Sequence, residues 1–158
     1  MNTNIPSDLQ QYIEDYGMFA AAYGLPRMAG KILGWLIVCS PPHQTAEEIE
    51  EALGASKGTV STMTRLLMHT GLIEKVGVPG RRRAHFRVKE DVWAEVISDE
   101  LNRMRQVREL AERGLGLLAE TPPENQKRLQ DMHEMFAFAE REWPAVLERF
   151  YRERLQRR

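Results

Sequence analysis

The sequence predicts a mainly α-helical protein with one small β-hairpin. Three observations carry this prediction: a helix-turn-helix pattern followed by a hairpin pattern in the middle of the chain, an aromatic helical stripe before it, and long apolar periodicities at helical spacing after it. We therefore divide the chain into an N-terminal helix over residues 1–25, a central unit over residues 26–89 and a C-terminal helical region over residues 90–158.

The first predicted helix covers residues 7–23. Its apolar side chains, most of them aromatic, recur at helical spacing and form one stripe, which needs an apolar partner surface. Leu25-Pro26 ends this helix, because proline cannot continue the ladder of backbone hydrogen bonds. The stripe consists of Leu9, Tyr12, Ile13, Tyr16, Phe19, Ala20 and Tyr23.

The second predicted helix continues to Cys39 and ends before Pro41-Pro42. Its most apolar stretch spans about twelve residues, whereas a helix that crosses a bilayer needs about 20. We therefore expect a buried helix and no membrane segment. Gly30 and Gly34 lie about one turn apart, which indicates a place where another helix approaches closely.

Residues 45–70 predict two helices joined by a tight turn. Thr45 followed by Glu48 is a capping box, in which hydroxyl and carboxylate each accept a hydrogen bond from an otherwise unpaired backbone N–H. Gly54 suits the left-handed conformation that ends one helix, and Ser56 can cap the next. This is the pattern of a helix-turn-helix.

The second of these helices, over residues 57–70, has two distinct faces. Val60, Met63 and Leu67 recur at spacings of three and four and are predicted to face the core. The opposite face carries short polar side chains and cations, which suits contact with base edges and phosphates. The predicted contact residues are Ser56, Lys57, Thr59, Ser61, Thr62 and Arg65.

The hairpin is predicted between residues 72 and 88. Gly71 ends the preceding helix, and Pro79-Gly80 suits the centre of a type II turn. The return strand alternates between apolar and polar residues, as a half-buried strand requires. Its inner face is predicted as Ala84, Phe86 and Val88, and its outer face as His85 and Arg87. The hairpin would be the wing of a winged helix-turn-helix core.

Charge separates this unit from the rest of the chain. Residues 57–89 contain eight Lys and Arg residues and one acidic residue, a net charge of +7, whereas the rest of the chain has −8. A polyanion should therefore bind the positive segment. Three consecutive arginines repel one another, and phosphates or a narrow minor groove would relieve that repulsion. The predicted wing contacts are Arg81, Arg82, Arg83, His85 and Arg87.

Double-stranded DNA fits this surface better than RNA, because a helix enters the wide major groove of B-DNA and not the deep, narrow groove of A-form RNA. The alternative is a winged-helix protein-interaction module that acts through its C-terminal helices.

The last part of the chain predicts two long helices. A helical pattern from residue 90 to about residue 120 would form a rod of about 45 Å, which Pro122-Pro123 ends. A further helix carries apolar residues with a period of about 3.5 residues. Pro144 lies inside this pattern and predicts a kink or a fresh helix start. The seam consists of Leu129, Met132, Phe136, Ala139, Trp143, Val146 and Phe150.

Such a rod exposes too much hydrocarbon for a monomer. We predict a homodimer formed by the N-terminal and C-terminal helices, which would hold two winged units at a fixed distance for a pseudopalindromic duplex. The alternative folds the last helices back on the same chain.

Neither catalysis nor a cofactor is predicted. The four histidines are scattered, and Cys39 is the single cysteine, so the sequence has no metal-ligand pattern. We also find no phosphate-binding glycine loop and no nucleophile elbow. Cys39 is expected to be a buried, inert thiol. The start of the chain lacks the pattern of a secretion signal, and we expect a cytoplasmic protein.

With these residues laid out, the chain resembles the MarR superfamily of bacterial transcription regulators, and more closely its GbsR-like branch. The matching stretch covers residues 24–88, and its most specific parts are ASKGTVST and GVPGRRR. The resemblance implies a homodimeric regulator with a recognition helix over residues 57–70 in the major groove and a wing over residues 79–87, its tip at 79–83, at the minor groove or backbone. We expect a repressor, with activation as the alternative. The long extension from Pro123 departs from the family pattern.

The same resemblance implies a small effector bound between the two regions. An apolar effector, where one exists, is predicted to bind where the N-terminal aromatic residues, the second helix and the start of the helix from residue 90 converge. The predicted lining residues are Tyr16, Phe19, Trp35 and Trp93. Core packing explains the same residues without a ligand.

Overall fold

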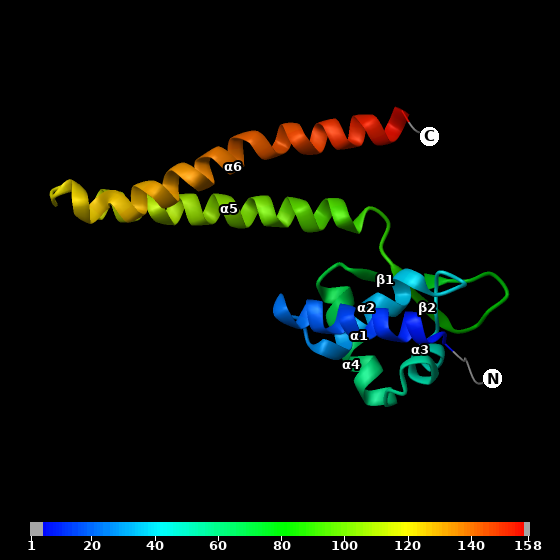
Figure 1. Cartoon of the computed structure of the whole chain (residues 1–158). Helices are drawn as coiled ribbons and strands as arrows, with labels where there is room; N and C mark the ends of the chain where they lie inside the picture. Colours follow the sequence, from blue (N-terminus) through cyan, green and yellow to red (C-terminus); the bar gives the residue numbers. More distant parts are fainter. Residues whose placement is uncertain (1–4, 157–158) are drawn as a thin grey trace. The chain divides into compact units, whose positions relative to one another are not determined.

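The computed structural model describes residues 5–156 and divides into two compact units, residues 1–92 and residues 93–158 (Figure 1). The predicted class, mainly α with a small hairpin, is confirmed. No helix in the described residues is long and apolar enough to cross a membrane. The first unit contains α1 (Ser7–Ala22), α2 (Arg27–Val38), α3 (Ala46–Leu53), α4 (Lys57–His69), β1 (Ile73–Gly77) and β2 (Ala84–Val88), and the second contains α5 (Val92–Leu117) and α6 (Pro123–Gln156).

Glycines allow α1 and α2 to pack closely. A Cβ atom at Gly30 would lie 2.5 Å from the Cβ of Ala20, and one at Gly34 would lie 2.9 Å from the Cβ of Tyr16. Larger side chains at these two positions would force the helices apart. The close helix approach predicted from the glycine spacing is therefore confirmed.

The core of the first unit is organised around α2, which packs against α1, α3, α4 and β2. Ile32 of α2 is fully buried, as are Ile49 of α3 and Leu67 of α4. Phe86 of β2 joins the same cluster. The helix-turn-helix and the hairpin thus rest on one apolar core, which fixes their positions relative to each other.

Local capping determines the helix-turn-helix. The Thr45 hydroxyl accepts a hydrogen bond from the Glu48 N–H at 3.2 Å, and the Glu48 carboxylate accepts one from the Thr45 N–H at 2.7 Å. Gly54 ends α3 with φ of 60°, a left-handed conformation that glycine adopts without strain. Ser56 Oγ accepts the Thr59 N–H at 3.2 Å and begins α4. The predicted caps and turn are confirmed.

The wing is an antiparallel hairpin in which Ile73 lies opposite Val88. The Arg81 N–H donates to the Val78 carbonyl at 3.0 Å, and Gly80 has φ of 78°. A type II turn requires a positive φ at its third residue and often has this hydrogen bond, so the predicted turn is confirmed.

A third segment joins the hairpin beside the start of α3. Gln44 and Phe86 exchange two backbone hydrogen bonds, 2.9 Å from the Gln44 N–H and 2.7 Å from the Phe86 N–H. Because Thr45 caps α3 directly after this bridge, β2 is connected to the N-terminal end of α3. The wing therefore lies against α3.

In the second unit, α6 turns back along α5 (Figure 1). Glu140 accepts hydrogen bonds from Arg108 at 2.6 Å and Arg105 at 2.9 Å. A Cβ atom at Gly114 would lie 2.8 Å from Leu129 Cδ1, so the two helices also touch there. The alternative in which the last helix folds back on the same chain holds for residues 129–140.

Pro144 lies inside α6, which continues on both sides of it. Of the two predicted alternatives, a fresh helix start is therefore excluded, and the kink stays a prediction. Proline cannot donate to the carbonyl four positions earlier, but this gap in the backbone ladder does not end the 34-residue helix.

Candidate nucleic-acid interface

The structure divides α4 into the two predicted faces. Val60 and Leu67 are fully buried, and Met63 is half-buried. Thr64 is also buried, where its hydroxyl donates to the Val60 carbonyl at 2.8 Å. Of the predicted contact residues, Thr59 is half-buried, and the exposed ones are Ser56, Lys57, Ser61, Thr62 and Arg65. These side chains form one polar surface.

The N-terminal end of α4 is suited to an anion. Its first turn carries Lys57 and no acidic residue. The partial positive charge at a helix N-terminus attracts phosphate, and the ammonium adds to that attraction. Arg65 lies two turns further along, and its Nε donates to the Ser61 carbonyl at 3.2 Å, which holds the guanidinium against its own helix.

Two of the three wing arginines form ion pairs with α3. Arg83 Nη1 lies 3.3 Å from Glu47 Oε1, and Arg81 Nη1 lies 3.9 Å from Glu48 Oε1. Within residues 5–156 the structure gives Arg82 no ion-pair partner. Neither glutamate was among the predicted site residues. The sequence did contain a signal for their position, because the capping box places both glutamates in the first turn of α3.

These charges meet around a pocket of about 370 Å³ between the wing and the first turns of α3. It is lined by Thr45, Glu47, Glu48, Glu51, Arg81, Arg82, Arg83 and His85. Burial raises the pKa of Glu48, but hydrogen bonds from the Thr45 N–H and hydroxyl, with the nearby His85 and Arg81, lower it overall. Glu48 is thus a carboxylate at neutral pH.

His85 differs from the prediction. Its side chain was expected on the outer face of the wing, but it is only 1% exposed, whereas Ala84 is exposed. The reason is the Gln44 bridge, which brings the His43 ring within 5.1 Å of the His85 ring. The Nδ1 atom lies 3.0 Å from the Arg83 carbonyl oxygen, and in the described residues Nε2 has no hydrogen-bond partner.

Because His85 is buried, it does not offer its ring to a phosphate or a base in this conformation. It instead holds the backbone that carries Arg83. Arg87 is also engaged within the hairpin: its Nε donates to Glu74 at 2.8 Å on the opposite strand, and its Nη1 lies 3.3 Å from Glu90.

The predicted effector residues are distributed over both units. Tyr16 is half-buried, and burial raises the pKa of its phenol; its ring centroid lies 6.0 Å from that of Phe19, which is 57% exposed. Trp35 is buried, and its Nε1 has no hydrogen-bond partner among the described residues. Trp93 is half exposed and belongs to the second unit, so the convergence of all four stays a prediction.

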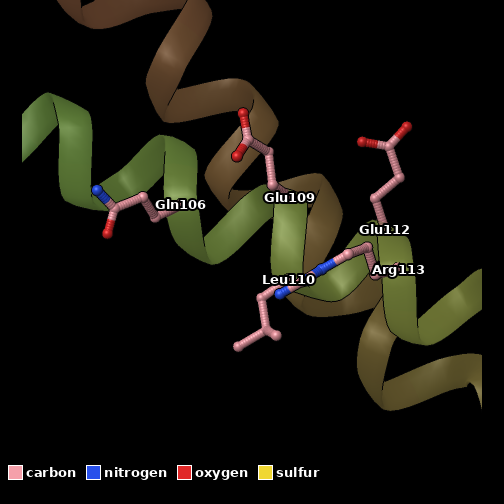
Figure 2. Close-up of a pocket in the computed structure, with 5 residues that line it drawn as sticks. All are labelled: Gln106, Glu109, Leu110, Glu112 and Arg113. Atoms are coloured by element: carbon pink, nitrogen blue, oxygen red, sulfur yellow. The ribbon is translucent and has the colours of Figure 1, made fainter.

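A second hollow of about 700 Å³ lies on α5. Figure 2 shows that the side chains around it diverge, with Glu109 and Leu110 on opposite sides of the helix. They do not converge on one point as ligand-binding groups do. In residues 5–156, no three His, Cys, Asp or Glu side chains are arranged to hold a metal ion. Cys39 is buried, and burial raises the pKa of its thiol to about 11.

Family models match most of the chain. A model described as MarR family matches residues 23–84, and one described as MmpR5-like MarR family transcriptional regulator matches residues 91–154. The extension from Pro123 was expected to depart from the family pattern. A MarR-type family model nevertheless covers it as far as residue 154. The GbsR-like branch stays untested.

Individual relatives agree. The chain is 37% identical over 133 residues to the HTH-type transcriptional regulator MmpR5 of Mycobacterium tuberculosis, which covers 84% of this chain and 81% of that protein. It is 32% identical over 76 residues to the HTH-type transcriptional repressor OpcR of Bacillus subtilis, 48% of this chain and 40% of that protein. A crystal structure described as a transcriptional regulator superposes with a TM-score of 0.71 at 35% identity, over 92% of this chain and 99% of that one.

Proposed function

Because the chain belongs to the MarR family of transcriptional regulators, we propose that it regulates transcription by binding double-stranded DNA as a homodimer. The exposed face of α4 enters the major groove, and the arginines of the wing lie at the adjacent minor groove or backbone. The observation that carries this proposal is the attachment of both surfaces to one core through α2, which keeps helix and wing in a fixed arrangement.

The chemistry of α4 supports base and phosphate contact. Ser61 and Thr62 are short and exposed, so the helix can approach the groove floor closely. Arg65 is exposed on the same face and can form the bidentate contact to guanine that arginine commonly makes. Lys57 at the helix start suits a flanking phosphate.

The homodimer is supported by apolar side chains that the single chain leaves exposed. On α6, Met135 is 65% exposed, and Phe138 and Phe150 are each 55% exposed. On α1, Phe19 is 57% exposed, and Tyr23 is 76% exposed. Burial of these two surfaces against a second copy would remove them from water and set the distance between two recognition helices.

Selection of a random duplex library on the full-length protein tests the proposal. We expect enrichment of a pseudopalindrome whose half-sites are separated by about one helical turn, roughly 10 base pairs, or a multiple of it. A footprint on the DNA upstream of its own gene should protect the same sequence. Repression follows where that site overlaps a promoter. Absence of enrichment, or enrichment of a lone half-site, would contradict the proposal.

Control by a small effector is the finer part of this proposal. The buried Trp35 Nε1 is a hydrogen-bond donor that a ligand acceptor could satisfy, and Tyr16 and Phe19 lie on the helix packed against α2. An effector changes DNA affinity only when it prefers one arrangement of the dimer. Tryptophan fluorescence during a screen of aromatic and cationic metabolites, paired with DNA affinity for each hit, tests this. Hits that leave DNA affinity unchanged would exclude a regulatory site.

A further inference from the structure

We propose that Glu47 and Glu48 compete with DNA phosphates for Arg83 and Arg81 and thereby weaken the binding of the wing to non-cognate DNA. This inference rests on the proposed function, because it assumes that the wing binds DNA. It adds a role for acidic residues beside the basic surface.

The two ion pairs have the geometry of a reversible contact. The Glu47 to Arg83 distance is 3.3 Å, and the Arg83 side chain remains 69% exposed. The Glu48 to Arg81 distance is 3.9 Å, and the Arg81 side chain remains 61% exposed. Exposed ion pairs are weak, so the charge density of a duplex can displace the carboxylates from the guanidinium groups.

Helix capping does not explain both glutamates. Glu48 uses Oε2 to accept the Thr45 N–H, and its Oε1 is the atom that faces Arg81. Glu47 takes no part in the capping box, and its Oε1 faces Arg83. Carboxylates beside a DNA-binding surface repel the phosphates of the DNA. The position of Glu47 and Glu48 therefore needs an explanation other than capping.

Low affinity for random DNA supplies that explanation. Binding to random DNA depends almost entirely on phosphate contacts, whereas a cognate site also gains base contacts with α4. Carboxylates that occupy two of the three wing arginines therefore reduce the affinity for random DNA, and the cognate complex tolerates the same loss because base contacts remain. The expected consequence is that random DNA stays largely unbound at protein concentrations at which the cognate site is still occupied.

The main test is Glu47→Gln, measured by fluorescence anisotropy on a random-sequence 30-base-pair duplex. We expect binding to tighten about two- to fivefold at low salt, the range of an exposed ion pair. Glu50→Gln is the matched control. This substitution removes the same charge from α3, and Glu50 is not among the residues that line the wing pocket. Glu48→Gln serves as the second variant, since glutamine keeps the capping box. Equal affinities for Glu47→Gln and Glu50→Gln would overturn the inference.

A double-mutant cycle separates a specific pair from general repulsion. In an Arg83→Ala background the gain from Glu47→Gln should disappear, and in an Arg82→Ala background it should persist, because Arg82 is not paired with Glu47. A gain of the same size in both backgrounds would overturn the inference and assign the effect to net charge. Far-UV circular dichroism checks that each variant is folded.

The outcome also separates this inference from the proposed function. If the wild-type protein binds DNA and the wing arginines are required, yet Glu47→Gln is neutral, only the competition by α3 is wrong. If the wild-type protein binds neither random nor selected duplexes, the proposed function and this inference both fail.

Discussion

At the scale of single residues, His85 shows how a side chain can serve the wing without reaching a ligand. Its Nδ1 atom lies 3.0 Å from the Arg83 carbonyl oxygen, at the point where β2 leaves the turn. The His43 ring packs against it, and 1% of its surface is exposed. Burial of an imidazole whose Nε2 has no partner in the described part of the chain is costly, and the contact with the wing backbone compensates for part of that cost.

The arginines of the wing carry the first prediction. Replacement of Arg81, Arg82 and Arg83 together by alanine should weaken binding to all duplexes and flatten the salt dependence. Each lost phosphate contact reduces the slope of log affinity against log salt concentration by about 0.9. Anisotropy titrations at several salt concentrations measure the slope. Alanine at the exposed arginines Arg128, Arg141 and Arg152 is the control, and an unchanged slope in the wing variant would disprove the wing assignment.

At the scale of elements, local chemistry made α3, α4 and the hairpin predictable. A capping box, a left-handed glycine and a Pro-Gly turn each depend on residues close together in the chain, so they can be recognised from the sequence alone. The burial of His85 was not predictable in this way, because it depends on the Gln44 bridge to β2. The pairing of Glu47 with Arg83 likewise joins residues 36 positions apart in the chain.

The cap of α3 gives a prediction about stability. Thr45→Ala removes the acceptor for the Glu48 N–H and should lower the free energy of unfolding by about 0.5 to 2 kcal/mol. Because α3 carries Glu47 and Glu48, the variant should also weaken their ion pairs with the arginines of the wing. Urea denaturation followed by circular dichroism measures the loss. Thr62→Ala, on the exposed face of α4, is the control and should change stability by less than about 0.5 kcal/mol.

The other half of the capping box predicts a pH dependence. The pKa of Glu48 is lowered in the folded protein below its ordinary value of 4.5, so the folded state binds its proton less readily than the unfolded state. The stability that the carboxylate contributes is therefore complete above about pH 4.5 and is lost as the pH falls through the folded value. Wild type and Glu48→Gln should differ in their unfolding free energy by an amount that shrinks with acidification. A difference that stays constant from pH 7 to about pH 3 would contradict this interpretation.

At the scale of the whole molecule, the apolar seam predicted on α6 contains residues with two different roles. Leu129 packs against Gly114 of α5, so it contributes to the second unit itself. Trp143, Val146 and Phe150 are exposed, as an interface with another copy requires. Periodicity alone could not separate the two groups, because a helix that folds back for part of its length uses the same apolar spacing for both contacts.

The dimer gives the last prediction. The full-length protein should sediment at about twice the chain mass of 18.3 kDa at micromolar concentration. Phe138→Glu together with Phe150→Glu should yield a monomer with intact helices, because both side chains are more than half exposed within the chain and their loss removes little internal packing. Phe138→Leu with Phe150→Leu keeps an apolar surface and should remain dimeric.

DNA affinity should follow the oligomeric state. A monomer presents one recognition helix, and it loses the second half-site and the avidity that a fixed spacing provides. The charge-introducing variant should therefore bind a selected pseudopalindrome much more weakly than wild type, yet bind an isolated half-site as wild type does. A monomeric variant that still binds the pseudopalindrome tightly would show that the winged units act independently, and the apolar surface of α6 would then have to serve a different protein partner.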